Sequence, residues 1–273
     1  MQSTSKIKAI LIDLSGTIHT DDEPTSNAIE ALQKLRSINS VQFRFVTNTT
    51  KESKETLLNR LHRIGFSSIT KDDMFTSLSA AVQFVQFKQL KPFYLLSEGA
   101  KRDFIANYET SPTNNNVVVG DEDSVVVGLA PDKFEYECMN KAFRILMKEN
   151  SQLIAVHEGK YFKRSDGLAI GPGCFTRGLE YSTGKKATII GKPNPYFFNN
   201  AIPKGLSPAE CCMIGDDIND DVFGAMDVGM KGILVRTGKY IENIESKYPR
   251  KPTRIADSFA DAIEWLISSK FEI

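Results

Sequence analysis

Residues 7–17 read IKAILIDLSGT, and this stretch decides the fold. Its first eight residues are nearly all apolar, which is the pattern of a β-strand buried on both faces, as in the interior of a parallel sheet. Asp13 stands near the end of the apolar run, and the small or polar letters SGT follow at 15–17. The stretch therefore predicts a central strand whose carboxyl end carries polar side chains.

The residues after this strand continue an alternation of helix and strand. Apolar residues at Ile29, Leu32 and Leu35 share one side of a predicted helix, and a second strand, VQFRFVT, ends near Thr47. Another amphipathic helix follows and stops at Gly65, which is a plausible C-terminal cap. Strand, helix, strand and helix in this order predict a parallel sheet with right-handed crossovers.

The same alternation returns late in the chain, whereas the middle has its own pattern of helices and strands. Three further buried strands are expected, and SFADAIEWLISS closes the chain as an amphipathic helix. The middle segment is long enough to be a domain of its own. We predict an α/β fold with a Rossmann-like, doubly wound parallel sheet core interrupted by an inserted α/β cap domain. The expected strands lie at about 187–192, 211–216 and 231–237, the core at 1–79 and 186–273, and the cap domain at 80–185.

Length and composition limit the possible classes of protein. The 273 residues suit two ordinary domains. Lys plus Arg and Asp plus Glu both number 34, so no excess of positive charge suggests a nucleic acid or a membrane surface as partner. The four cysteines form no CxxC pair and no zinc-ligand spacing. Without a signal peptide or an apolar stretch of about 18 residues, we expect a cytoplasmic protein.

Polar residues follow the ends of four expected strands. In open α/β sheets, ligands bind beyond the carboxyl ends of the strands, so these residues should converge at one edge. Two of the segments carry carboxylates, one carries hydroxyl and amide groups, and one carries a lysine. The segments are Asp13–Thr17, Thr47–Thr50, Gly191–Pro193 and Gly215–Asp221.

These residue types have a common chemical logic. Carboxylates with no nearby positive charge repel one another, and oxygen ligands of this kind suit Mg²⁺, which often bridges to phosphate. An aspartate such as Asp13 can attack phosphorus and form an aspartyl-phosphate. A lysine offsets negative charge in such a site, and Thr and Asn donate hydrogen bonds to phosphoryl oxygens. Gly16 would let the backbone approach an anion closely.

The four segments, in this order, resemble the motifs of the haloacid dehalogenase-like hydrolase superfamily, in the branch with a large α/β cap between the second and third motifs. The similarity covers essentially the whole chain and implies an Mg²⁺-dependent phosphatase that acts on a small phosphorylated substrate or a phosphorylated side chain. It also leaves a homodimer possible. The resemblance implies a nucleophile and metal ligand at Asp13, a metal carboxylate at Asp216, and a metal ligand at Ser15 through its backbone carbonyl. It implies a catalytic and phosphate-binding lysine at Lys192, phosphate-binding positions at Thr47 and Asn48, and orienting residues at Asp217 and Asp221. We expect Ser15 and Gly16 to contact the substrate as well.

Ser15 departs from the pattern of many phosphatases in this superfamily. They have a second aspartate two residues after the nucleophile, which protonates the leaving group and later activates water. A neutral hydroxyl is a poor acid near pH 7, so up to roughly 10²–10⁴-fold of acid–base catalysis could be missing. We therefore expect a preference for phosphoramidates, pyrophosphate and aryl phosphates over simple alkyl phosphates.

Several alternatives remain open on sequence grounds. Asp13 and the Asp216–Asp217 pair could cap helices, and the latter could cap and bind metal at once. Carbon–halogen cleavage and a phosphomutase are other enzymatic possibilities, but the acidic loop argues against the first and Ser15 against the second. A catalytically weak phosphate- or protein-binding module is a different class. In the cap, His157 and Arg164 are candidates for substrate specificity, although His157 could equally be structural.

Overall fold

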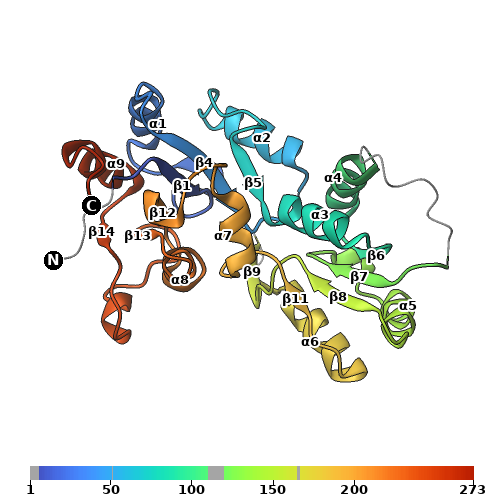
Figure 1. The fold of residues 1–273 in the computed structure, drawn as a ribbon. Helices are drawn as coiled ribbons and strands as arrows, with labels where there is room; N and C mark the ends of the chain where they lie inside the picture. The colour runs from blue at the N-terminus through green and yellow to red at the C-terminus, as the bar shows by residue number, and fades with distance from the viewer. Residues whose placement is uncertain (1–5, 51, 110–119, 165–166) are drawn as a thin grey trace. The chain divides into compact units, whose positions relative to one another are not determined.

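The computed structural model describes residues 6–50, 52–109, 120–164 and 167–273. The chain divides into two compact units (Figure 1), which are described separately. Unit 1 consists of Met1–Thr47, Leu58–Phe75 and Lys192–Ile273, and unit 2 of Asn48–Leu57 and Thr76–Gly191. The divisions after Phe75 and after Gly191 lie a few residues from the ends of the cap domain expected at 80–185. No pattern in the sequence indicated that residues 48–57 belong to unit 2.

Unit 1 is built on a six-stranded sheet in the order β14-β13-β12-β1-β4-β5. β1 lies inside the sheet and runs parallel to both of its neighbours, β12 and β4. β13 is parallel to β12 and to β14. The strands are β1 Ala9–Asp13, β4 Gln42–Thr47, β5 Met74–Thr76, β12 Cys211–Gly215, β13 Lys231–Val235 and β14 Arg254–Ala256.

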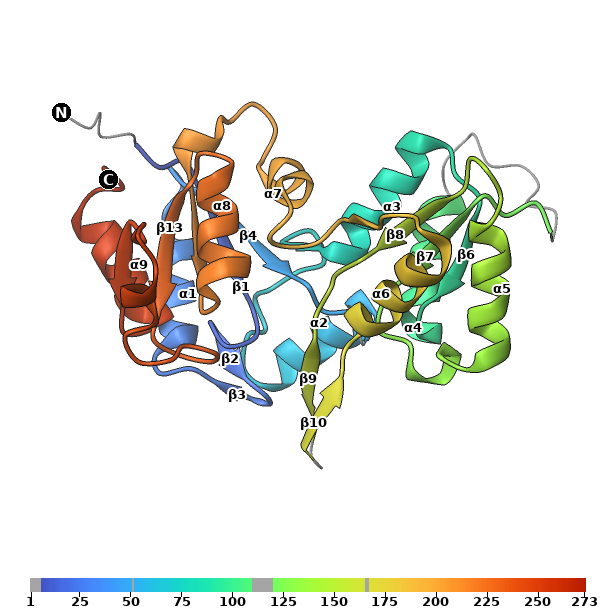
Figure 2. The same ribbon diagram turned by 90° about the horizontal axis from the view of Figure 1, so that it is seen from below.

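The central strand is apolar because helices cover both faces of this sheet. All five residues of β1 are buried. α1 packs against α9, α7 packs against α8, and the two pairs lie on opposite sides of the sheet (Figure 2). The helices are α1 Ala28–Arg36, α7 Pro195–Ala201, α8 Gly224–Asp227 and α9 Phe259–Ser268, together with the part of α2 Lys54–Arg63 that follows Leu57. A short hairpin of β2 His19–Thr20 and β3 Glu23–Pro24, a π-helical segment η3 Ile218–Phe223 and the 3₁₀ turns η2 Pro208–Glu210 and η4 Ile244–Lys247 complete the unit. The predicted doubly wound parallel sheet is confirmed.

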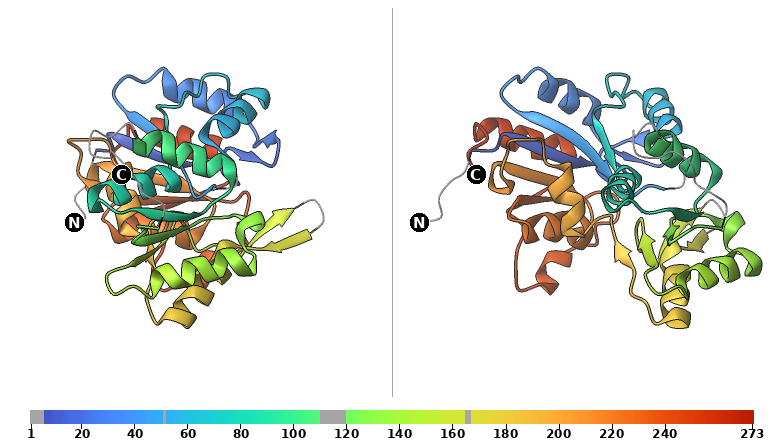
Figure 3. Two further views of the ribbon diagram at one scale, coloured as in Figure 1. Left: turned by 90° about the vertical axis from the view of Figure 1, so that its right-hand side faces the viewer. Right: turned by 45° about the vertical axis from the view of Figure 1, so that its right-hand side comes forward.

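Unit 2 has its own four-stranded sheet in the order β11-β8-β7-β6, and all neighbouring strands in it are parallel. The side chains of Val125 and Val127 pack with Ala142 of α5 and Leu179 of α6, so these two helices cover one face. A two-stranded hairpin of β9 and β10 projects from the unit (Figure 3). The elements are α3 Ser77–Lys88, β6 Pro92–Leu95, α4 Glu98–Glu109, β7 Ser124–Val127, η1 Pro131–Lys133, α5 Tyr136–Leu146, β8 Gln152–Ala155, β9 Tyr161–Arg164, β10 Gly167–Ile170, α6 Pro172–Thr183 and β11 Thr188–Ile189.

Two strands differ from the sequence expectation. We expected residues 187–192 to add a strand to the core sheet, but β11 pairs with β8 in the sheet of unit 2. A short apolar run shows that a strand is present but not which sheet it joins. β5 was not expected, because three residues are too few to show an alternating pattern.

Among the described residues, no helix combines the length and the apolar character that a membrane crossing requires.

Replacing Leu11, a fully buried residue of β1, by alanine should lower the free energy of unfolding by about 2–5 kcal/mol, because it removes buried methyl groups and leaves a cavity. Urea denaturation followed by circular dichroism measures the loss. Ile241→Ala is the control in the same unit, since Ile241 is 60% exposed and its truncation should change stability by no more than about 0.5 kcal/mol. Equal stability of the two variants would contradict this packing of β1.

Candidate active site

Asp13 is the last residue of β1, and the chain turns sharply after it. The Ile18 amide donates a hydrogen bond to the Leu14 carbonyl, and the Gly16 amide donates to the His19 carbonyl. Gly16 has a φ of 93°, and a Cβ atom there would overlap the carboxylate of Asp216. Only glycine meets both requirements, so the turn brings the backbone after β1 directly against the loop after β12.

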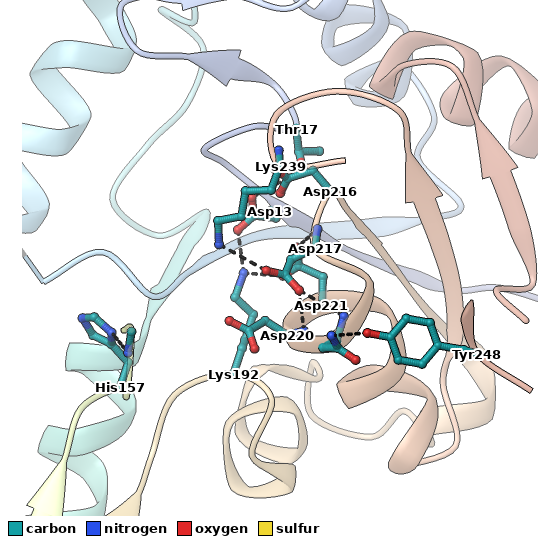
Figure 4. Close-up of polar contacts among 12 residues, drawn as sticks. Asp13, Thr17, His157, Lys192, Asp216, Asp217, Asp220, Asp221, Lys239 and Tyr248 are labelled. Atoms are coloured by element: carbon teal, nitrogen blue, oxygen red, sulfur yellow. Dashed lines mark hydrogen bonds and ion pairs between the residues drawn. The ribbon is translucent and has the colours of Figure 1, made fainter. Parts of the chain in front are cut away.

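Lys192 lies between two buried carboxylates (Figure 4). Its Nζ atom donates to Asp13 Oδ1 at 2.5 Å and to Asp221 Oδ1 at 2.6 Å. All three side chains are at least nine-tenths buried. Burial alone would lower the pKa of Lys192, but the charges of Asp13 and Asp221 outweigh it and raise that pKa above its ordinary value. Lys192 therefore carries a positive charge in contact with the carboxylate expected to be the nucleophile.

The loop after β12 supplies the other carboxylates. Asp216 follows the strand directly, and Asp217 caps the π-helical segment by accepting hydrogen bonds from the amides of Asn219 and Asp220. The Asp217 amide donates to Asp221 Oδ2 at 3.1 Å, which turns the other oxygen of Asp221 toward Lys192. The helix-capping role considered for Asp217 is thus confirmed.

Negative charge exceeds positive charge at the centre of this site. Carboxylate oxygens of Asp13, Asp216 and Asp221 can be chosen within 4.8 Å of one another, and Lys192 is the ammonium group that contacts two of these residues. Burial, and then the charge of Asp13, raises the pKa of Asp216 from 3.8 to about 7. Burial likewise raises the pKa of Asp221. A group of hard oxygen ligands with uncompensated negative charge fits a divalent cation such as Mg²⁺, and Asp13, Asp216 and Asp221 are the residues that could hold it.

The loop after β13 also contacts these residues, although our sequence analysis did not select it. The Lys239 amide donates to Asp216 Oδ2 at 2.7 Å, and the Thr237 hydroxyl donates to the Gly16 carbonyl at 2.5 Å. The letters RTGK directly follow β13, so the rule that ligands lie beyond strand ends would have found them.

The remaining predicted residues fall in different places. Ser15 is exposed in the turn after β1, and Thr47 is buried at the end of β4, one residue beyond the partner of Asp13 in the sheet. Asn48 belongs to unit 2, where its side-chain oxygen lies against Gly191. The backbone of Arg164 lies in β9, but its side chain lies outside the described part of the structure.

His157 also belongs to unit 2, and both of its ring nitrogens have protein partners. The Gly159 amide donates to Nδ1 at 3.2 Å, which makes Nδ1 the acceptor. Nε2 then carries the proton in the neutral ring and donates to the Thr50 hydroxyl oxygen at 2.9 Å. The same oxygen accepts from the Leu129 amide at 3.2 Å. This network favours a structural role for His157 in joining Thr50 to the end of β8.

Comparisons with known proteins agree with this fold. Two family models match the chain, "Haloacid dehalogenase-like hydrolase" at residues 10–110 and a HAD-hydrolase-like model at residues 189–262. The chain belongs to the haloacid dehalogenase-like hydrolase family.

Individual relatives are similar over almost their whole length. Haloacid dehalogenase-like hydrolase domain-containing protein 2 of Homo sapiens is 46% identical over 98% of each chain. Phospholysine phosphohistidine inorganic pyrophosphate phosphatase of Homo sapiens is 33% identical over 96% of this chain and 94% of its own. Among solved structures, p-nitrophenyl phosphatase of Archaeoglobus fulgidus has a TM-score of 0.85 at 26% identity, covering 96% of this chain and all of its own. The 4-nitrophenylphosphatase of Thermotoga maritima has a TM-score of 0.84 at 25% identity, over 94% and 97% of the two chains.

Mg²⁺ should stabilise the metal-free protein more at pH 8 than at pH 6. The folded-state pKa of Asp216 lies near 7, above its ordinary 3.8, so this group's contribution to stability is complete below pH 3.8 and is lost as the pH rises through 7. At pH 8 the cation meets a deprotonated ligand, whereas at pH 6 it must displace a proton. Thermal denaturation in EDTA and in Mg²⁺ measures the difference in melting temperature at each pH.

Asp216→Asn is the control for this effect, because it keeps the shape of the side chain but removes the titrating group. Its melting temperature should respond weakly to Mg²⁺ at both values of pH. A wild-type protein that Mg²⁺ stabilises equally at pH 6 and pH 8 would contradict the raised pKa of Asp216.

Proposed function

We propose that the chain is an Mg²⁺-dependent phosphatase that forms an aspartyl-phosphate on Asp13. The observation that carries the proposal is the buried contact of Asp13 with the Lys192 ammonium, beside the carboxylate of Asp216. A carboxylate at a strand end, next to a fixed positive charge and a cation site, is suited to attack an anionic phosphoryl group. The relatives whose names identify them as phosphatases support the same reaction class.

Asp13, Lys192 and Asp221 of unit 1 have different roles in the proposed reaction. A carboxylate oxygen of Asp13 attacks phosphorus, the bond from phosphorus to the leaving group breaks, and the leaving group departs with the electron pair and takes a proton from solvent. Water then attacks the phosphorus of the aspartyl-phosphate, which releases inorganic phosphate and restores the carboxylate. Lys192 holds Asp13 in place and offsets negative charge on the phosphoryl oxygens. Asp221 holds Lys192 in turn, through the 2.6 Å contact.

The cation would be held by the side chains of Asp13 and Asp216 and the backbone carbonyl of Ser15. When bound, Mg²⁺ would offset the charge that the phosphoryl group brings to an already acidic site. Thr47 and Asn48 are proposed to donate hydrogen bonds to phosphoryl oxygens. We also propose that residues 80–185 act as the cap that selects the leaving group.

The cysteines bear on the cellular location of the enzyme. All four cysteines are free, and burial raises the pKa of Cys211 to about 11, which keeps this thiol protonated and unreactive. Four thiols without a disulfide, two of them buried, suit a reducing compartment, so we propose a cytoplasmic location. That two copies of the chain form a homodimer, as the family resemblance allows, stays a prediction.

Asp13→Asn should lower the Mg²⁺-dependent hydrolysis of p-nitrophenyl phosphate by roughly 10³–10⁶-fold, because the amide is not a nucleophile. Release of p-nitrophenol measures the rate. Asp257→Asn is a matched control, since Asp257 is exposed and pairs with Arg236. Equal rates in wild type and Asp13→Asn would contradict covalent catalysis by Asp13. They would favour the alternative, a catalytically weak phosphate- or protein-binding member of the fold.

Ser15 should bias the enzyme toward leaving groups that need little protonation. We expect kcat/KM for imidodiphosphate or phospholysine to exceed that for glycerol phosphate by roughly tenfold or more, because a hydroxyl cannot supply general acid catalysis. Ser15→Asp should raise the rate with glycerol phosphate relative to the other two, whereas Ser15→Asn should not. Faster turnover of glycerol phosphate by the wild-type enzyme would contradict the assignment.

A further inference from the structure

The loop after β13 reaches two other loops of unit 1. β13 ends at Val235, and residues 236–239 read RTGK. In the sheet, β13 neighbours β12 but not β1. Its loop nevertheless contacts both the loop after β12, at Asp216, and the loop after β1, at Gly16. It therefore passes over the end of β12 and connects the two segments that carry the expected metal ligands.

The contacts of this loop are specific in the atoms they use. The Lys239 amide donates to Oδ2 of Asp216 at 2.7 Å, so Oδ1 is the oxygen that this loop leaves uncovered. The Thr237 hydroxyl donates to the carbonyl of Gly16, the residue after Ser15. The first interaction fixes one oxygen of Asp216, and the second fixes the carbonyl next to Ser15. Neither Thr237 nor the Lys239 amide is itself a proposed ligand of the cation.

Gly238 allows the close approach between these segments. Its φ is 57°, in the left-handed region, and a Cβ atom there would overlap both Asp216 Oδ2 and the Cα of Gly16. The backbones at Gly16 and Gly238 thus pack against the same carboxylate. The Lys239 side chain is 68% exposed, and its Nζ lies 3.3 Å from Asp217 Oδ2 (Figure 4).

We propose that Thr237, Gly238 and the Lys239 amide form a positioning clamp for the cation site. The clamp holds Asp216 through Oδ2, so that Oδ1 would be the oxygen available to a cation, and it holds the Gly16 carbonyl next to Ser15, whose own carbonyl would be the second ligand from this region. Groups that orient metal ligands commonly change metal affinity by about 10–100-fold when they are removed. The inference rests on the proposed function in that it takes Asp216 and Ser15 as cation ligands, but it concerns binding and not turnover.

Thr237 offers a matched pair of variants. Thr237→Val keeps the shape of the side chain and removes the hydroxyl, whereas Thr237→Ser keeps the hydroxyl. Titration calorimetry with MgCl₂ should show affinity weakened by about 10–100-fold in Thr237→Val and within about threefold of wild type in Thr237→Ser. Arg236→Ala is the control at the neighbouring position, because Arg236 is exposed and pairs with Asp257; its Mg²⁺ affinity should match wild type.

A merely structural role of the loop predicts a different pattern. It would lower the melting temperature of the metal-free protein and leave Mg²⁺ affinity unchanged in the folded variant. Melting in EDTA is therefore measured for every variant, and affinity is compared at a temperature where each is folded. Gly238→Ala is a second test, because its methyl group would displace Asp216 and should abolish measurable Mg²⁺ binding.

The outcomes separate this inference from the proposed phosphatase activity. Unchanged Mg²⁺ affinity in Thr237→Val overturns the clamp, even if wild type hydrolyses p-nitrophenyl phosphate. Weakened affinity in Thr237→Val with rescue in Thr237→Ser supports the clamp, even if wild type shows no turnover, and in that case the phosphatase proposal alone fails. A wild-type protein that does not bind Mg²⁺ overturns both.

Discussion

The site depends on one ammonium group that is buried between two carboxylates. Removing Lys192, Asp13 and Asp221 from water costs several kcal/mol for each charge. The attraction between them offsets this cost only if the contacts are short and hydrogen-bonded. The contacts at 2.5 and 2.6 Å meet that condition. Because the three residues come from distant parts of the chain, the pairing also fixes the loops after β1 and β12 relative to the segment that follows β11. The interaction that constrains these loops is therefore also the one that places the Lys192 ammonium against Asp13, the proposed nucleophile.

Close packing of backbone is the second constraint on the site. Asp216 lies where the loops after β1 and β13 meet, and a side chain at either Gly16 or Gly238 would occupy the space of its carboxylate. The parallel sheet explains why these loops meet at all, since it directs the ends of β1, β12 and β13 to one edge. The sheet thus gives the approximate position of each acidic group, and the glycines and backbone donors set its orientation.

The sequence predicted the features that depend on long or repeated patterns. The buried strand ending at Asp13 and the doubly wound sheet followed from apolar periodicity, and the family followed from four ordered motifs. The membership of β11 in the second sheet did not, because a strand's partners depend on contacts distant in sequence. The position of residues 237–239 after an expected strand could have drawn attention to them, but their contacts could not be predicted, because these depend on a backbone amide and a hydroxyl that any similar turn could carry. The sequence thus indicated Asp13, Lys192 and Asp216, and also Asp221, which contacts Lys192, but not the backbone contacts made by residues 237–239.

The excess of negative charge also distinguishes between the reactions that this fold could support. Carbon–halogen cleavage needs no metal, so an enzyme of that kind would gain nothing from Asp216 buried beside Asp13. Such a carboxylate raises the cost of folding, as the pKa of Asp216 near 7 indicates. A phosphoryl substrate adds further negative charge, and the proposed Mg²⁺ would balance it together with Lys192. The acidic loop after β12 would therefore cost stability without benefit in an enzyme that cleaves carbon–halogen bonds, whereas it could bind a cation in a phosphatase. Phosphate hydrolysis is the chemistry that best accounts for its presence.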